Sequence, residues 1–144
     1  CLAAQKGITA VGALSNIDAV THWAGSYESV SIICAGELSG RRFALEDFAV
    51  AARFIHKLTS MYSSLELDDA ARLASELGNY ERWLASSLTS DHTPSSRLII
   101  SATHGQELIK LGFTADLQFC ATENTSQMVP YVVSSDKNWS ILKN

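Results

Sequence analysis

The spacing of apolar residues divides the first part of the chain into strand-like and helix-like segments. Residues 8–14 and 30–34 are short and β-tolerant, so both are predicted to be strands, the second buried on both faces of a sheet. Between them, apolar residues recur at helical spacing over residues 17–24, after Asn16, a good N-cap, and before Gly25. A short helix is therefore expected to link the two strands.

The middle of the chain carries longer helical patterns. Apolar residues at steps of three and four over residues 44–58 predict a helix, which we expect to cover the strand at 30–34. A second helical stretch runs from Asp68, a good cap, to about Ser90, and Gly78-Asn79 is expected to interrupt it. A further, less regular helix is predicted from Pro94, preorganised for a first helical position, to the stop at Gly112.

Two strands are predicted to close the chain. Residues 116–121 and 128–134 have strand-like composition, and Pro130 suggests that the second lies at a sheet edge. Strand, helix, strand, helices and two strands is the order of an α/β fold. We therefore expect residues 1–144 to form one layered α/β/α domain, with a mixed sheet and helices on its faces.

Composition limits the partners and the compartment. With 11 Lys and Arg against 15 Asp and Glu, the net charge is −4, and the only basic pair is Arg41-Arg42, so neither nucleic acid nor a membrane surface is expected. The 3 cysteines show no close spacing, which argues against disulfides and a zinc site and favours the cytoplasm. Because Cys1 is not an initiator Met and shows no targeting signature, a preceding segment is expected.

The most informative segment connects the predicted buried strand to the next helix. Gly36 and Gly40 permit close backbone approach, the helix start offers free N–H groups, and Arg41 and Arg42 can bind phosphate or sulfonate oxygens. This arrangement is typical of an anion cradle, although it lacks the Gly-Lys-Ser/Thr of a nucleotide-binding loop. The alternative is a plain strand-to-helix connection with solvated arginines.

Carboxylates near this cradle are candidate metal ligands. Glu46 and Asp47 lie in the first predicted turn of the helix, where the helix dipole by itself would favour negative charge. Adjacent helical residues diverge by about 100°, so if a cation binds, one carboxylate is expected to be its ligand and the other to act as a cap or to support the ligand from behind. Mg²⁺ suits such a site because it takes only one or two carboxylates. Asp116 is a further candidate, or simply a turn residue.

Nucleophiles and bases are less clearly marked. Cys34 and Cys120, at predicted strand ends, are candidate nucleophiles or small buried apolar residues, with no base visible near either. The 4 histidines share no ligand spacing, and His104, beside Gly105, is the one we retain. A role for Cys1 as an N-terminal nucleophile is disfavoured because the residues after it look helical.

Several motifs together resemble the 2-phosphosulfolactate phosphatase family, in the same order along nearly the whole chain. They are Ile32-Ile33-Cys34-Ala35-Gly36 followed by Gly40 and Phe43-Ala44-Leu45-Glu46-Asp47, then Asp69-Ala70-Ala71, Ser101-Ala102-Thr103-His104-Gly105, and Asp116-Leu117-Gln118-Phe119-Cys120-Ala121. The family's N-terminal portion, with its Asp-Val-x-Arg-Ala-Thr segment, is absent. The chain therefore resembles the carboxyl part of a family member.

The resemblance implies a Mg²⁺-dependent hydrolase of the phosphate ester of sulfolactate, a small anionic substrate from coenzyme M synthesis. As a hypothesis for this reaction, we assign catalytic roles to Cys34, Glu46 and His104 and metal ligation to Glu46, Asp47 and Asp116, with an activated water attacking phosphorus in line. We expect the substrate to bind against Gly36, Gly40, Arg41, Arg42 and Asn16.

The absent portion is expected to complete this site, either in the same protein or through pairing, and a homo-oligomer is another expectation. The alternative is a non-catalytic module, either an anion-binding domain or a structural half that pairs with another chain. Exposed apolar residues near positions 1–14 would favour a half-domain over a self-sufficient module.

Overall fold

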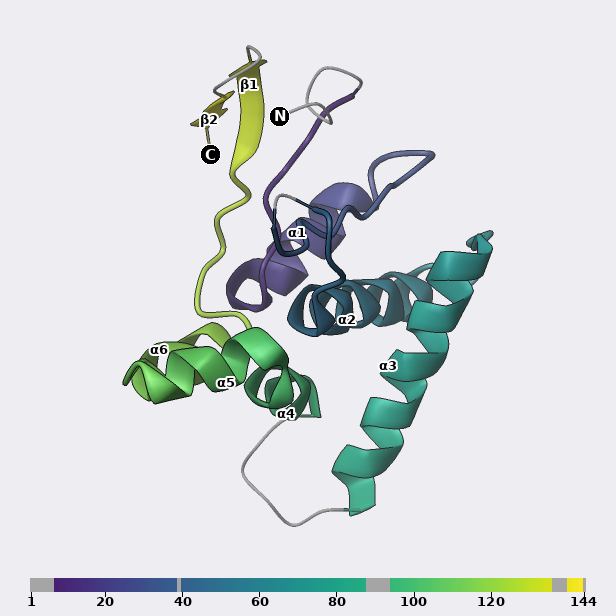
Figure 1. Ribbon diagram of the computed structural model, residues 1–144. Coiled ribbons are helices and arrows are strands. Elements are labelled where there is room, and N and C mark those ends of the chain that lie inside the picture. The colour runs from purple at the N-terminus through teal and green to yellow at the C-terminus, as the bar shows by residue number, and fades with distance from the viewer. Residues whose placement is uncertain (1–6, 39, 88–93, 136–139, 144) are drawn as a thin grey trace.

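A computed structural model of the chain describes residues 7–38, 40–87, 94–135 and 140–143 (Figure 1). The described part is rich in helices and contains one small antiparallel sheet of two strands. The expected mixed sheet is not present among these residues. Helix α2 lies in the middle of the fold, with α3 along one side of it and α4, α5 and α6 grouped on another.

The first two helices confirm the predicted patterns. A 3-10 turn, η2 (Leu14–Asn16), leads into α1 (Ile17–Ala24), and α2 spans Leu45–Met61. Asn16 occupies the N-cap position of α1, as predicted, but its side chain makes no capping bond there. Instead, the backbone N–H of Asp18 donates to Asn124 Oδ1 at 3.0 Å, so a residue far along the chain supplies the cap.

Helix α3 (Asp69–Ser87) runs through Gly78 without the predicted interruption. Its cap is as expected, since the N–H of Ala71 donates to Asp68 Oδ1 at 2.8 Å. A Cβ at Gly78 would lie 3.1 Å from His56 Cβ and 3.3 Å from the Ala52 carbonyl oxygen, both on α2. Gly78 therefore serves close packing of α3 on α2, and the last predicted residues of this helix lie outside the described part.

The single helix predicted from Pro94 divides into α4 (Pro94–Ser101) and α5 (Thr103–Lys110). Ala102, between them, has an extended backbone with φ −58° and ψ 151°. The bend of the chain at Ala102 brings Gly105 so close to α4 that a Cβ there would lie 2.2 Å from the Ile99 carbonyl oxygen. Gln106 Nε2 donates to the carbonyl of Ile100 at 2.7 Å and so satisfies a backbone acceptor near the end of α4.

The strand predicted at 116–121 is wrong, because Thr114–Cys120 forms helix α6. Leu117 and Ala121, four residues apart, are both 6% exposed and join the main core. Burial of this i, i+4 pair on one helical face outweighs the local strand-like alternation. Asp116 therefore lies in the first turn of a helix rather than at the start of a strand.

The other predicted strands are only partly formed. Strand β1 (Tyr131–Ser135) overlaps the strand predicted at residues 128–134. It pairs antiparallel with β2 (Ser140–Lys143), a strand that was not predicted. Residues 8–14 contribute a single bridge, from Ala10 to Tyr131. The segment 30–34 is an exposed connection instead of a buried strand, so α2 does not cover it. A strand needs a partner, and no other described segment supplies one here.

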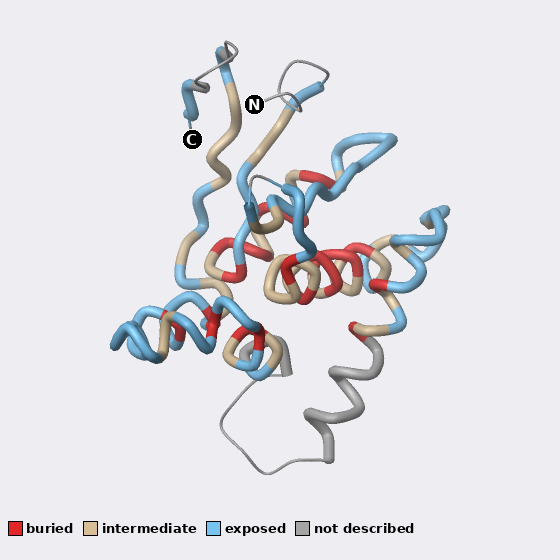
Figure 2. The backbone as a smooth tube through the Cα atoms, viewed as in Figure 1, coloured by how far each residue is buried: buried red, intermediate tan, exposed pale blue. Residues whose placement is uncertain are grey.

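The core lies on two faces of α2 (Figure 2). On one face, Phe54 packs in the main cluster, whose other buried members are Leu14, Ile17, Val20, Ile99, Leu117 and Ala121. On the other, Ala52 and Ile55 pack against Ala74 of α3. Small residues on α2 and α3 let these two helices approach closely, which accounts for the extensive contact between them.

An ion-pair cluster joins α2 to the turn after α6. Arg53 donates to both carboxylate oxygens of Glu123, at 2.7 and 3.0 Å, and Lys57 Nζ lies 2.6 Å from Asp18 Oδ1 and 3.6 Å from Glu123 Oε2. These side chains are mostly half-buried, and the Arg–carboxylate pair is bidentate, so the geometry is specific as well as attractive. The cluster holds the start of α1 and the segment after α6 on the same side of α2.

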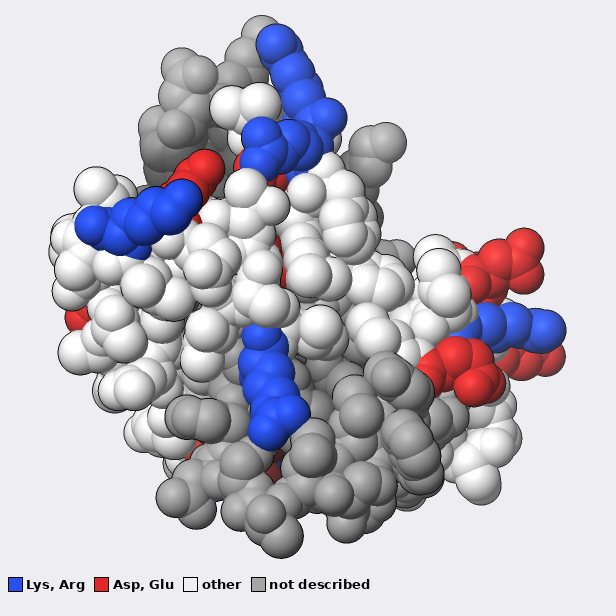
Figure 3. Space-filling view, turned by 60° about the horizontal axis from the view of Figure 1, so that its bottom comes forward, with Lys and Arg blue, Asp and Glu red and all other residues white. Residues whose placement is uncertain are grey.

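Charged groups elsewhere are dispersed. On the face shown in Figure 3, uncharged residues make up most of the described surface, and Lys and Arg do not form one continuous patch. Among the helices that the structure describes, none is sufficiently long and apolar to cross a bilayer.

Replacement of Ile17, which is 0% exposed, by Ala is expected to lower the free energy of unfolding by about 2–5 kcal/mol, because it leaves a cavity in the main cluster. Urea denaturation followed by circular dichroism measures this loss. Leu73→Ala, at a position 65% exposed on α3, is the control and should change stability by less than about 0.5 kcal/mol. Equal losses in the two variants would contradict the described core.

Candidate functional site

A tight turn precedes α2 and shapes one wall of the candidate site. The N–H of Glu37 donates to the Arg42 carbonyl at 3.0 Å, and the N–H groups of Arg41 and Arg42 donate back to the Glu37 carbonyl at 3.1 and 3.2 Å. Gly36 has φ +70°, and a Cβ there would lie 2.9 Å from the Arg42 carbonyl oxygen. Only glycine fits this position without strain.

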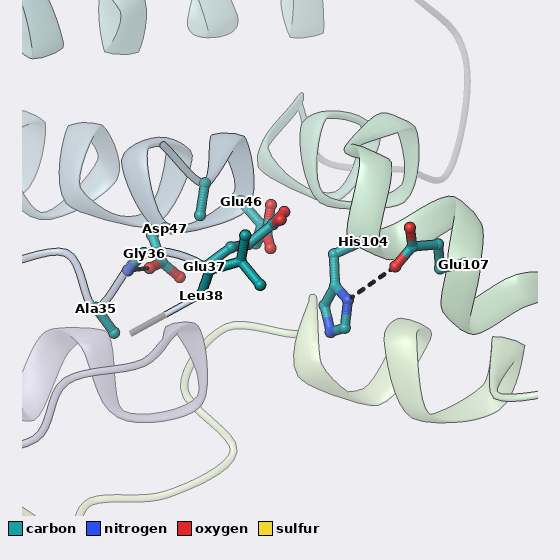
Figure 4. Close-up of a pocket in the computed structure, with 9 residues that line it drawn as sticks. Ala35, Gly36, Glu37, Leu38, Glu46, Asp47, His104 and Glu107 are labelled. Carbon is teal, nitrogen blue, oxygen red and sulfur yellow. Dashed lines mark hydrogen bonds and ion pairs between the residues drawn. The ribbon is translucent and has the colours of Figure 1, made fainter. Parts of the chain in front are cut away.

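This turn, the start of α2 and helix α5 line a pocket of about 450 Å³. His104 and Glu107 of α5 lie across the pocket from the turn and from the first residues of α2 (Figure 4). The charged or titratable lining residues are Glu37, Glu46, Asp47, His104 and Glu107. The pocket thus brings together four of the residues proposed from the sequence, Gly36, Glu46, Asp47 and His104. Glu37 and Glu107 were missed, because no local pattern marks them.

Asp47 holds the turn against the helix. Its Oδ2 accepts a hydrogen bond from the backbone N–H of Gly36 at 2.7 Å. Backbone amides near this turn were expected to bind an anion, but a carboxylate of the chain itself accepts the hydrogen bond from this one. Of the two adjacent carboxylates, Asp47 is therefore the one engaged by a backbone amide of the turn, and it does not cap α2.

Glu46 has a different environment. Its Oε2 is buried without a hydrogen-bond partner, and it is the one such side-chain atom among the residues whose contacts are described. A buried carboxylate oxygen is costly to leave unsatisfied, so this atom is suited to a cation or a hydrogen-bond donor that binds in the pocket. A carboxylate is also a ligand that Mg²⁺ accepts.

The residues present fit a magnesium ion only as a partial ligand set. No group of three or more His, Cys, Asp or Glu side chains in the described part of the chain is arranged to hold a metal. Mg²⁺ commonly keeps several waters and takes one or two protein carboxylates together with substrate phosphate oxygens. Glu46, with its unpartnered oxygen, meets that smaller requirement.

His104 and Glu107 form the polar wall on α5. His104 Nδ1 lies 3.6 Å from Glu107 Oε2, one turn further along the helix. Both side chains are more than half exposed, so the pair contributes little to stability. An imidazole beside a carboxylate is a common arrangement for moving a proton.

Cys34 lies next to the pocket and does not line it. Desolvation of the thiol and, secondly, the negative charge of Asp47 raise the pKa of Cys34 above its ordinary value. The thiolate is the nucleophilic form, so these surroundings disfavour nucleophilic attack by Cys34 at neutral pH. The alternative prediction, that Cys34 and Cys120 are small buried residues, is wrong, because both are exposed.

The remaining predicted residues lie outside the pocket lining. Arg42 pairs with Glu37, with Nε 2.8 Å from Oε2, while Gly40 and Arg41 are exposed on the turn. Asn16 is 6% exposed and donates to the carbonyls of Val11 and Met128, at 3.1 and 2.9 Å. Asn16 thus joins two segments of backbone. Asp116 is exposed on α6.

The fold and pocket define a helix-rich α/β chain with a carboxylate-rich site between a glycine turn and a histidine-bearing helix. Residues 2–135 match the sequence profile of the 2-phosphosulpholactate phosphatase family, so the chain belongs to that family. Among its relatives, a probable 2-phosphosulfolactate phosphatase of Thermotoga petrophila is 32% identical over 119 residues, or 83% of this chain and 45% of the relative.

Two further relatives bear the same name. The protein of Thermotoga maritima is 31% identical over 119 residues, again 83% of this chain and 45% of the relative. That of Carboxydothermus hydrogenoformans is 34% identical over 89 residues, or 62% of this chain and 32% of the relative. The chain thus spans less than half the length of these relatives.

The raised pKa of Cys34 predicts slow alkylation at neutral pH and a rate that continues to rise above the ordinary thiol range, because only the thiolate reacts. Asp47→Asn removes a neighbouring negative charge, lowers the pKa and should accelerate the reaction at pH 8. Iodoacetamide labelling followed by peptide mass spectrometry measures the rate at Cys34. Asp116→Asn, distant in sequence and exposed, is the control. A rate unaffected by Asp47→Asn would contradict the assigned electrostatics.

Proposed function

We propose that this chain carries part of the active site of a Mg²⁺-dependent phosphatase that hydrolyses 2-phosphosulfolactate, or a similar small anionic phosphate ester, to the hydroxy acid and phosphate. The observation that carries the proposal is the buried, unpartnered Oε2 of Glu46 in a pocket between the glycine turn and α5. Family membership supports the reaction class.

The charge of the pocket supports a requirement for a cation. Its lining includes the carboxylates of Glu37, Glu46, Asp47 and Glu107, and none of the Lys and Arg residues that the structure describes lines it. A phosphate dianion entering such a pocket alone would be repelled. A bound Mg²⁺ would neutralise phosphate charge and make the phosphorus easier to attack.

Each pocket residue has a distinct proposed role. Glu46 would hold the metal through its free oxygen. Asp47, which accepts a hydrogen bond from the Gly36 amide, would hold the turn against the first turn of α2, beside Glu46. Arg41 and Arg42, on the outer side of the turn, would attract the substrate's anionic groups, with Gly36 and Gly40 allowing backbone approach. To reach an anion, Arg42, whose side chain is 50% exposed, would have to leave its 2.8 Å contact with Glu37, whose side chain is 21% exposed.

His104 is the proposed proton-transfer group. In this role its imidazole would take a proton from the attacking water or give one to the leaving alkoxide oxygen, and Glu107 would hold the ring in place. The water attacks phosphorus opposite the ester oxygen, the P–O bond to the hydroxy acid breaks, and the leaving oxygen is protonated. Cys34 is left out of this scheme because of its raised pKa.

A half-domain is the second candidate, favoured by exposed apolar residues near the start of the chain. Ile8 is 65% and Val11 49% exposed.

This candidate includes the layered α/β/α arrangement with a mixed sheet, which would form when the rest of a family-length protein packs against this surface. In such a protein the substrate would belong to coenzyme M synthesis, and the reaction would take place in the cytoplasm.

The metal assignment predicts that Mg²⁺ together with millimolar phosphate raises the melting temperature of the chain, since ligands that bind only the folded state stabilise it, by about 2.7 kcal/mol at one hundred times Kd. Glu46→Gln should remove the rise by replacing the free carboxylate. Differential scanning fluorimetry measures it. Glu76→Gln, the same charge change at an exposed position of α3, should keep it. A rise that survives Glu46→Gln would refute the assignment.

The proton-transfer assignment predicts that His104→Gln lowers kcat by about 10²- to 10⁴-fold while leaving the Mg²⁺-dependent melting shift in place. Phosphate release from 2-phosphosulfolactate is followed with the chain alone and with the chain supplied with the part of the Thermotoga petrophila relative that it does not span. His22→Gln, at an exposed position of α1, is the control. Equal kcat values for the two variants would exclude His104 from the chemistry.

A further inference from the structure

The segment that leads into the pocket exposes a run of large apolar side chains. Val30 is 44%, Ile32 38% and Ile33 70% exposed in the connection between α1 and α2 (Figure 2). β-Branched residues in series favour an extended strand. In an extended chain, Ile32 and Ile33 point to opposite sides, so the apolar surface faces outward on both sides of the segment.

The backbone of this segment is also without partners in the described structure. From Glu28 to Ala35 no residue forms a backbone hydrogen bond, bridge or ladder contact with another described residue. A run of free N–H and C=O groups beside apolar side chains is a template for adding strands. The segment predicted to be a strand therefore has no neighbour to pair with among the described residues.

We infer that residues 30–34 are an inner strand of a sheet that is completed by extended segments from the part of a family-length protein that this chain does not span. The relative from Thermotoga petrophila is more than twice as long as its matched region, since this chain covers 45% of it, so it has ample length to supply them. The docked strand presupposes the half-domain proposed above and does not depend on hydrolysis.

A second copy of the chain is a poorer occupant for this surface. Pairing of the same segment from two copies would satisfy one edge of each strand. The other edge, and apolar side chains on both faces, would remain exposed to water. A larger unit that provides strands and covering helices satisfies all of these groups at once.

Docking here would also act on the pocket. Residue 34 is followed directly by Ala35, Gly36, Glu37 and Leu38, which line the pocket. In the described structure this wall is held by the turn hydrogen bonds and by the Gly36–Asp47 bond. Pairing of residues 30–34 would anchor its other end and limit the positions that Glu37 can take.

The test produces this chain together with the part of the Thermotoga petrophila relative that it does not span, as two polypeptides, and isolates the complex by size-exclusion chromatography. Hydrogen exchange read by mass spectrometry then reports on the peptide containing residues 30–34. We expect at least tenfold slower exchange of these amides in the complex than in the chain alone. Ile33→Lys should abolish co-elution, whereas Leu73→Lys, at a similarly exposed position on α3, should not. Circular dichroism confirms that both variants retain their helices.

Three results would overturn the inference in distinguishable ways. A complex in which residues 30–34 exchange as fast as in the free chain would refute strand pairing by these residues but not the half-domain proposal. Absence of a complex would refute both the strand pairing and the half-domain proposal. The Mg²⁺-dependent melting shift would still test the proposed metal site separately. Slow exchange in the chain alone that is lost on dilution would identify a second copy as the occupant.

Discussion

Burial of two faces of α2 is the constraint on which the rest of the described structure depends. One face carries Phe54 into the main cluster, and the other places Ala52 and Ile55 against α3. Because a helix buried on two sides cannot rotate without losing one of its contacts, the direction of its first turn is defined. That first turn contains Glu46 and Asp47, so core packing at one part of the helix orients carboxylates at another.

The pocket combines a rigid wall with one that depends on long-range packing. Gly36, its positive φ and the hydrogen bond from its amide to Asp47 make the turn and the start of α2 a single unit. His104 comes from α5, whose position is set by the bend at Ala102 and by the core contacts of α4. A carboxylate-rich pocket with one unsatisfied oxygen favours a cation, and a cation in turn makes the pocket suitable for an anionic ester.

Local patterns predicted the helices well and the sheet poorly, for one physical reason. The spacing in residues 17–24 and 45–61 identifies a face to be buried, and any apolar partner satisfies it, so these helices form as expected. A strand requires a particular neighbour for its backbone, and residues 30–34 have none in the described structure. Residues 116–121 allow either structure, and core burial of Leu117 and Ala121 favours the helix.

The sequence by itself determined the helices at residues 17–24 and 45–61, the glycine turn before α2 and the presence of Glu46 and Asp47 at a helix start, because each is encoded within a few neighbouring residues. Tertiary structure decided which carboxylate is engaged and which is free, that His104 and Glu107 face them, and that Asn16 links backbone segments. These outcomes depend on contacts between residues far apart in the chain. A local pattern specifies which face of an element is buried, and packing alone selects what lies against it.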